Sequence, residues 1–215
     1  MSRLPLRVAI EGPCCAGKTT LGRGLEQELQ PLRTAYIMDY YEYTRGGGFF
    51  PRPIPGSAAE AEDALRWLLN VEERRTAQAR AAENQLDVIL IDRSIHTLLA
   101  HRYALKKVGK FNDFQSAQDL IDSSVIPLWP DVIMYLDMPQ NLVHQRNNGK
   151  FEPDNIFIDA DFNQGIRTYF QRFAGVPHHR IAWLDAANSI VMIRAIVNMH
   201  IGSLVSQLDN EKEVR

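Results

Sequence analysis

Five short apolar runs alternate along the chain with longer segments in which apolar residues recur every three or four positions. The runs are residues 6–11 (LRVAIE), 34–39 (TAYIMD), 87–92 (DVILID), 131–137 (DVIMYLD) and 180–185 (RIAWLD). Continuous apolar runs of this length, rich in Val and Ile, are typical of strands buried on both faces of a parallel sheet. The pattern therefore predicts five parallel strands.

The segments between the runs carry helical patterns. In residues 19–31, Leu21, Leu25 and Leu29 share one helix face and Pro31 ends the helix. The other predicted helices are residues 58–85, 160–174 and 189–208. Strands and helices in alternation predict an α/β fold with a doubly wound sheet, helices on both faces, and a ligand crevice at the carboxyl ends of the strands.

We interpret residues 1–215 as a single domain that carries three special segments. Residues 39–56 (DYYEYTRGGGFFPRPIPG) follow the second strand and combine aromatic, glycine and proline residues. Long irregular loops in compact domains are often functional, so this segment is the expected substrate loop. A short lid is expected at about residues 146–160, and the polar residues 209–215 are expected to form a frayed tail.

Composition and charge narrow the class of partner. The chain has 215 residues, 45% of them hydrophobic, and a net charge of −2. These values are ordinary for a soluble protein and offer no basic surface for nucleic acid or an anionic membrane. The apolar runs are far shorter than a membrane span, and the N-terminus lacks a signal-peptide core. We expect a cytoplasmic protein with a small-molecule partner; a homodimer stays open.

A phosphate-binding loop follows the first run. Gly12, four further residues and then Gly17, Lys18 and Thr19 match the G-x-x-x-x-G-K-[ST] pattern between a strand and a helix. Backbone N–H groups of such a loop face phosphate oxygens, the lysine reaches the β- and γ-phosphates, and the threonine ligates Mg²⁺. The expected ATP-binding residues are Gly12, Pro13, Cys14, Cys15, Ala16, Gly17, Lys18, Thr19 and Thr20. The motif indicates the P-loop NTPase fold. The five apolar runs would form its five-stranded sheet.

The third run ends in Asp92, which Arg93 follows at once. Asp92 at a strand end can hold Mg²⁺ or one of its waters, so Thr19 and Asp92 are the predicted metal residues. Arg93 adds a fixed cation with a planar set of donors. The chain lacks the Asn-Lys-x-Asp motif by which GTPase switches recognise guanine, and it is shorter than most motors.

At these residues the chain resembles the thymidylate kinase and deoxynucleoside kinase group of P-loop kinases. Thymidylate kinases carry Asp-Arg-Tyr after the third strand and deoxynucleoside kinases carry Glu-Arg-Ser, whereas this chain has Asp92-Arg93-Ser94. PDVIMYLDMPQNLVHQR resembles the family's fourth strand and its lid, and RIAWLDAANSI resembles the fifth strand and the loop near adenine. The resemblance covers about 190 residues and implies an ATP- and Mg²⁺-dependent kinase.

The acceptor residues depart from the thymidylate kinase pattern. Arg45 precedes a Gly-Gly-Gly run that only partly matches the family's Arg-Glu-Pro-Gly-Gly-Thr, and Arg74 fits a base-reading arginine while Asn70 replaces the stacking phenylalanine. A base could instead stack on Tyr40, Tyr41 or Tyr43, which could equally be packing residues. The predicted substrate residues are Asp39, Tyr40, Tyr41, Arg45, Arg74 and Arg93.

The remaining catalytic candidates serve the transfer itself. Asp39 could accept a proton from an attacking hydroxyl. Arg146 is the expected lid cation, with Lys150 as the alternative. The predicted catalytic set is Lys18, Asp39, Asp92, Arg93 and Arg146. We expect a kinase of a nucleoside, a nucleoside monophosphate or a similar small molecule; the alternatives are a kinase of a non-nucleotide hydroxyl metabolite and a non-catalytic, regulatory P-loop protein.

Overall fold

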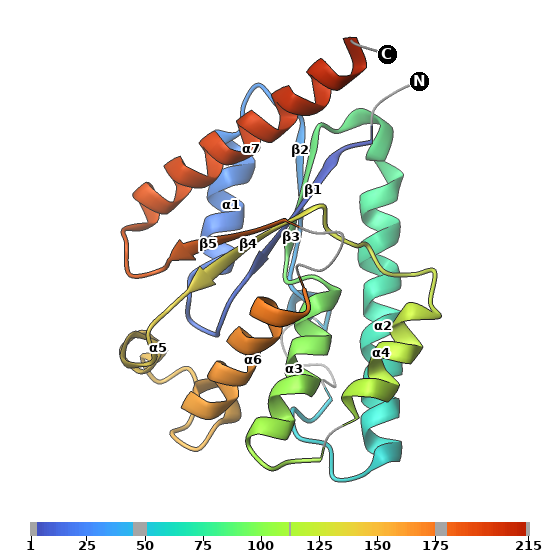
Figure 1. Ribbon diagram of the computed structural model, residues 1–215, viewed down its shortest axis with the longest axis vertical. Helices are drawn as coiled ribbons and strands as arrows, with labels where there is room; N and C mark the ends of the chain where they lie inside the picture. The colour runs from blue at the N-terminus through green and yellow to red at the C-terminus, as the bar shows by residue number, and fades with distance from the viewer. Residues whose placement is uncertain (1–3, 45–50, 112, 175–179, 214–215) are drawn as a thin grey trace.

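The computed structural model describes the backbone of residues 4–44, 51–111, 113–174 and 180–213, and side chains as far as residue 208 (Figure 1). Within these residues five parallel strands form one sheet in the order β2-β3-β1-β4-β5. The strands are β1 (Leu6–Glu11), β2 (Thr34–Ile37), β3 (Val88–Asp92), β4 (Val132–Asp137) and β5 (Arg180–Asp185). The predicted sheet is therefore confirmed, with an edge strand β2 that ends before Met38 and Asp39.

Helices cover both faces of the sheet, as predicted. The helices are α1 (Lys18–Glu28), α2 (Ala58–Ala81), α3 (Ile95–Lys107), α4 (Phe114–Asp122), α5 (Gln140–Asn147), α6 (Ala160–Arg172) and α7 (Ile190–Glu213), with short 3₁₀ turns η1 (Tyr40–Thr44), η2 (Glu83–Gln85) and η3 (Ile156–Ile158). Figure 1 shows α1 and α7 together on one side of the sheet, and α2, α3 and α6 on the other.

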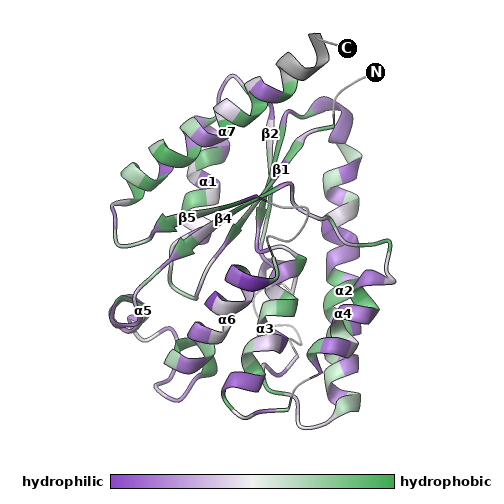
Figure 2. Ribbon diagram, in the orientation of Figure 1, coloured by the Kyte–Doolittle hydropathy of each residue, from purple (hydrophilic) through white to green (hydrophobic). Residues whose placement is uncertain are grey.

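Alternate residues of each strand supply two separate cores. Val8 and Ile10 of β1 pack toward α1 and α7 in one buried cluster, whereas Ala9 packs with residues of α2, α3 and α6 in another. All three are completely buried. Period-two alternation with apolar residues on both faces is the reason the strands appear in the sequence as unbroken apolar runs. Figure 2 shows this hydrophobic character along the strands.

Two boundaries differ from the sequence-based expectation. Backbone helix α7 continues to Glu213, so residues 209–213 are helical where a frayed tail was expected. The segment is rich in Glu and Lys, which are good helix formers, and it extends a helix that is already anchored by burial. Helix α1 ends at Glu28 with a cap at Leu29, two residues before Pro31.

Helix α7 also carries several exposed apolar side chains. Residues Ile190–Leu208 have the length and composition of a membrane span, as core helices of soluble proteins also can. One side of the helix packs into the core through Ile193, Val197 and Ile201, while Met192 and Met199 are exposed. The predicted absence of a membrane partner therefore remains a prediction.

Candidate active site

The phosphate loop joins the end of β1 to the start of α1. Gly12 and Gly17 have φ angles of 136° and 92°, which a residue without a Cβ adopts at little cost. A Cβ on Gly12 would lie 2.5 Å from the carbonyl oxygen of Leu136, so glycine alone fits beside β4. The loop leads into the N-terminus of an eleven-residue helix, which is the arrangement that binds anions in P-loop proteins.

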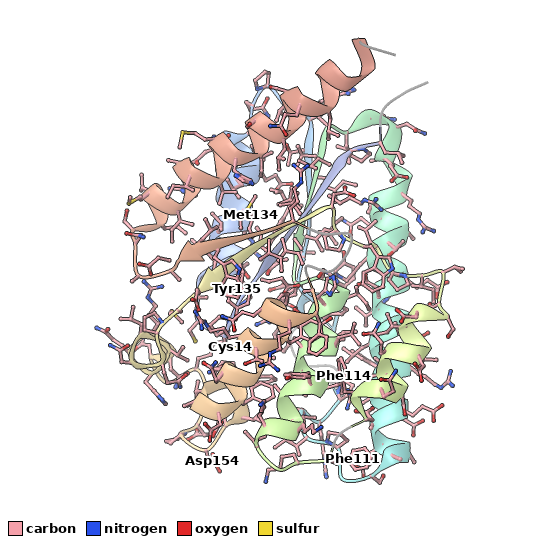
Figure 3. The ribbon with its side chains drawn as sticks, in the orientation of Figure 1. Cys14, Phe111, Phe114, Met134, Tyr135 and Asp154 are labelled. Atoms are coloured by element: carbon pink, nitrogen blue, oxygen red, sulfur yellow. The ribbon has the colours of Figure 1, made fainter. Side chains whose placement is uncertain are left out.

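The middle of the loop is formed by Cys14 and Cys15, both free and half-buried. Figure 3 places Cys14 beyond the carboxyl ends of the central strands. Burial raises the pKa of the Cys15 thiol, and a thiol that stays protonated is a poor nucleophile. This environment supports a packing role for Cys15. Of the other predicted loop residues, Pro13 and Ala16 are buried and Thr20 is exposed.

Lys18 lies under the loop that it follows. Its Nζ donates a hydrogen bond of 2.6 Å to the carbonyl oxygen of Pro13, and its side chain is buried. Burial lowers the pKa of Lys18 to about 8, and the positive charge of Arg93 acts in the same direction. Nucleotide phosphates would offer this ammonium several charged oxygens, which make stronger hydrogen bonds than a single carbonyl.

Three side chains from separate elements meet behind Lys18. The Thr19 hydroxyl and the Tyr36 hydroxyl each donate a 2.7 Å hydrogen bond to Oδ2 of Asp92. Asp92 is completely buried and its Oδ1 has no hydrogen-bond partner. A buried carboxylate oxygen is costly unless something binds it. The arrangement therefore fits Mg²⁺ or a magnesium-bound water at Oδ1.

The described residues contain no cluster of three or more His, Cys, Asp or Glu side chains that could enclose a metal on their own. This observation also fits magnesium. Mg²⁺ usually keeps several waters and takes further oxygens from substrate phosphates, with only one or two protein ligands. Thr19 and Asp92 are thus sufficient as the protein's share of such a site.

The predicted pair of acceptor residues lies on the other side of the loop. Nε of Arg93 donates to Oδ2 of Asp39 at 3.1 Å, and Nη2 of Arg93 approaches the Cys14 sulfur at 3.5 Å. Both members of the ion pair are mostly buried, with 18% and 27% of their side chains exposed. The carboxyl end of β3 therefore presents Asp92 toward the phosphate loop helix and, one residue later, Arg93 toward Asp39.

A buried arginine fixes the backbone at this turn. Arg93 has a φ angle of 60°, which is unusual for a residue with a side chain. Nη2 of Arg75 donates to the carbonyl oxygens of both Asp92 and Arg93, at 2.9 and 2.6 Å, and its Nη1 pairs with Glu72 at 2.7 Å. Arg75 and Glu72 are each 1% exposed. The pair therefore holds α2 against the end of β3.

Glu11 fixes the same turn from the side of β1. Its carboxylate accepts hydrogen bonds from the backbone N–H and the hydroxyl of Ser94, at 2.7 and 2.8 Å, and from the hydroxyl of Thr97 at 2.5 Å. Burial raises the pKa of Glu11, while these hydrogen bonds act in the opposite direction. Residues 92–94 are thus held by both neighbouring elements.

The other predicted substrate residues have different surroundings. Tyr40 is 2% exposed, and its ring lies 4.1 Å from the guanidinium carbon of Arg75, which supports packing. Tyr41 is exposed, and Arg74 is exposed with its guanidinium carbon 5.9 Å from the Tyr43 ring. Arg45 lies outside the described residues. The structure thus brings Asp39 and Arg93 together, with Arg75 rather than Arg74 beside them.

The expected lid, at about residues 146–160, comprises the end of α5, a turn and η3. The side chain of Asn147 closes the turn, because it donates to the carbonyl of Phe151 at 2.8 Å and accepts from the N–H of the same residue at 2.9 Å. Arg146 is exposed and its Nη1 lies 3.6 Å from the sulfur of Met138. Lys150 is also exposed, and its Nζ lies 5.2 Å from the centre of the Phe151 ring. Burial raises the pKa of Cys15, and the positive charge of Lys150 acts in the opposite direction.

A cavity of 620 Å³ adjoins the phosphate loop at the carboxyl ends of β4 and β5. Its walls include Pro13, Tyr135, Trp183 and Arg167. Arg167 makes a two-pronged ion pair with Asp137, at 2.8–3.1 Å, and the Tyr135 and Trp183 rings lie 4.4 Å apart. These residues are on the α6 side of the sheet, opposite to α1.

Sequence reasoning missed four residues that organise the site, namely Glu11, Tyr36, Glu72 and Arg75. Two of them had a usable signal, because Glu11 ends an apolar strand as Asp92 does, and Tyr36 lies inside another apolar run. Glu72 and Arg75 stand three apart on a helix, which is common on solvated surfaces. Only the packing of α2 against β3 distinguishes them from such a surface pair.

Comparison with known proteins gives relatives of two kinds, and no protein-family model matches the chain. A thymidylate kinase of Leuconostoc citreum (strain KM20) is 28% identical over 203 residues, which are 86% of this chain and 89% of that protein. A thymidylate kinase of Chromobacterium violaceum is 30% identical over 106 residues, which are 49% of this chain and 50% of that protein.

Solved structures of deoxyadenosine kinase from M. mycoides have the same fold. The structure with the products dCMP and a flexible dCDP has a TM-score of 0.67 at 14% identity and covers 92% of this chain and 100% of that one. The structure with dATP has a TM-score of 0.62 at 16% identity, with the same coverage. The predicted resemblance is therefore confirmed as a similarity: the chain is similar in sequence to thymidylate kinases and shares the fold of a deoxynucleoside kinase.

Proposed function

We propose that this chain transfers the γ-phosphoryl group of ATP to a hydroxyl group of a nucleoside. The observation that carries the proposal is the ion pair between Asp39 and Arg93 beside the phosphate loop. A hydroxyl is a weak nucleophile at neutral pH and gains from a carboxylate that accepts its proton. A nucleoside monophosphate already offers an ionised oxygen and needs no such base.

Donor binding is the task of the loop and of Lys18. The backbone N–H groups of residues 14–19 would cradle the phosphates, and Lys18 would exchange the Pro13 carbonyl for phosphate oxygens. Thr19 and the free Oδ1 of Asp92 would hold Mg²⁺, which when bound would supply positive charge beside the phosphates. Catalysis by such a site consists mostly of positioning and charge stabilisation.

Acceptor activation is the task of Asp39. Arg93 holds Oδ2 of this carboxylate, which leaves Oδ1 to face an acceptor hydroxyl. The arginine fixes the orientation of this carboxylate, and its Nη2 approaches Cys14 in the loop where the transferred group would lie. Asp39 would take the hydroxyl proton as the oxygen attacks the γ-phosphorus, and ADP would leave.

The replacement Asp39→Asn tests this role, because it keeps the shape of the side chain and removes the proton acceptor. We expect kcat with the best nucleoside to fall roughly 10²–10⁴-fold while KM changes little. Steady-state kinetics with a coupled ADP assay measure both constants. Asp87→Asn is the matched control, because Asp87 pairs with Arg33 outside the site, beyond the amino ends of β2 and β3. A near-normal kcat in Asp39→Asn would overturn the proposal.

A second candidate is a nucleoside monophosphate kinase, and the relatives named thymidylate kinase favour it. Under this alternative Asp39 orients Arg93, and Arg93 contacts the acceptor phosphate. Activity measured side by side on nucleosides and on their monophosphates separates the two candidates. In a monophosphate kinase, Asp39→Asn would be mild or would strengthen acceptor binding, because it removes a negative charge near the phosphate.

A further inference from the structure

The side chain of Tyr36 packs against α1 at a position where the helix carries a glycine, Gly22. The residue lies in the edge strand β2 and is 8% exposed. Its ring crosses toward α1, where a Cβ on Gly22 would stand 2.3 Å from the Tyr36 Cε2 atom. A glycine inside a helix costs about 1 kcal/mol relative to alanine. Gly22 therefore leaves space for the aromatic ring and lowers the stability of helix α1.

The ring carries its hydroxyl to the predicted metal site. The Tyr36 hydroxyl donates a 2.7 Å hydrogen bond to Oδ2 of Asp92. Thr19 donates to the same carboxylate oxygen. Both donors are thus on Oδ2, and the buried Oδ1 is left without a partner. Two donors on one oxygen fix the plane of the carboxylate.

We infer that Tyr36 is a positioning residue for magnesium binding, which it serves by holding Asp92 so that Oδ1 faces the ion or its water. The inference rests on the proposed function, since it assumes a Mg²⁺–ATP donor. A hydroxyl has one proton and two lone pairs. While the Thr19 proton points to Asp92, its lone pairs are available to the ion. Tyr36 keeps Asp92 in place to receive that proton.

The test is the magnesium dependence of ATP binding in Tyr36→Phe. The rise in Tm that saturating ATP produces is measured over a series of Mg²⁺ concentrations and again in EDTA. We expect the Mg²⁺ concentration for half of the rise to increase by about 10–100-fold, as for other residues that orient metal ligands. The response to ATP in EDTA should stay close to that of the wild type, because the Tyr36 hydroxyl bonds the side chains of Asp92 and Thr19 and not the backbone N–H groups or Lys18 that would bind the phosphates.

Tyr169→Phe is the matched control, because Tyr169 is also a buried tyrosine and its hydroxyl lies 2.9 Å from Nδ1 of His96. It should lower Tm without changing the magnesium dependence. Gly22→Ala should shift that dependence in the same direction as Tyr36→Phe, since the added methyl group displaces the ring. Gly24→Ala should not, because its methyl group meets only the flexible end of Arg194.

The outcomes separate this inference from the proposed function. If the wild type responds to Mg²⁺ and ATP and Tyr36→Phe responds at the same Mg²⁺ concentration, the role of Tyr36 is overturned and the kinase proposal stands. An equal loss with and without Mg²⁺ would also overturn it, since a merely structural residue behaves in that way. A wild type that gives no response to ATP under any condition overturns both.

Discussion

Lys18 combines a full charge with nearly complete burial, and its acceptor is a carbonyl of its own loop. In the proposed function this buried charge serves ligand binding and lowers the free energy of unfolding of the ligand-free protein. Its pKa of about 8 lies below the ordinary value of 10.5 because burial disfavours the charged form. Below pH 8 the folded protein must hold the charge in the core, whereas above pH 8 it sheds the proton.

We therefore expect Lys18→Met to stabilise the nucleotide-free protein at pH 7, by about 1–3 kcal/mol. Between pH 8 and the unfolded pKa the unfolded chain binds more protons at Lys18, so wild-type stability rises with pH there. The advantage of Lys18→Met should accordingly shrink as pH rises from 8 to 10. Denaturant or thermal unfolding of both proteins at matched pH measures the difference; a difference that is independent of pH would contradict this explanation.

Residues with local signals were predictable from the sequence, and residues defined by packing were not. Gly12, Lys18 and Thr19 follow from one motif, and Asp92 and Arg93 follow from a charged pair at a strand end. Arg75 is indistinguishable in sequence from its neighbour Arg74, since a helix turn of about 100° per residue decides which one is buried. That rotation is fixed by the core under α2.

At the scale of elements, the lid contains two cations, Arg146 and Lys150, that are candidates to stabilise the transferred phosphoryl group. Arg146 ends near Met138, while the Lys150 charge acts on Cys15 in the phosphate loop. Asn147 closes the turn that contains Lys150 through its bonds to Phe151. We therefore propose Lys150, the alternative that the sequence offered to Arg146, as the cation that stabilises the transferred group.

We expect Lys150→Ala to lower kcat far more than Arg146→Ala, with little change in the KM for ATP, because this charge matters mainly in the transition state. Arginines with this task in other P-loop enzymes contribute about 10³–10⁵ in rate. Single-turnover kinetics on the two variants, with Lys107→Ala as a surface control, provide the comparison. A larger loss in Arg146→Ala would return the role to Arg146.

Element prediction succeeded where the apolar period was clear. All five strands appear close to their expected positions, whereas α3, α4 and α5 were not predicted as helices. Helix α3 is buried on several sides, through Leu98, Leu99, Ala100 and Ala104, so its sequence lacks the single apolar face that marks a surface helix. Helix α5 has only eight residues, which is too short for a periodic signal.

At the scale of the whole molecule, ligand binding should increase the stability of the folded protein. We expect Mg²⁺–ATP to raise the free energy of unfolding by about 2.7 kcal/mol at a ligand concentration 100 times Kd. For a chain of this size that is a rise in Tm of about 5–11 °C, at about 2–4 °C for each kcal/mol. Lys18→Ala should fold normally and lose both this shift and phosphoryl transfer. A Lys18→Ala variant with full activity would contradict the kinase proposal.

One peptide bond joins the residue that we propose for the donor metal to the residue that we propose for the acceptor. Asp92 and Arg93 are consecutive, and the single turn between them is held by Glu11, through Ser94, and by Arg75. A backbone shift on one side of this turn is therefore transmitted to the other. Changes of acceptor in evolution or in the laboratory should accumulate in η1 and the exposed face of α2, where side chains can vary without misaligning the two halves of the reaction.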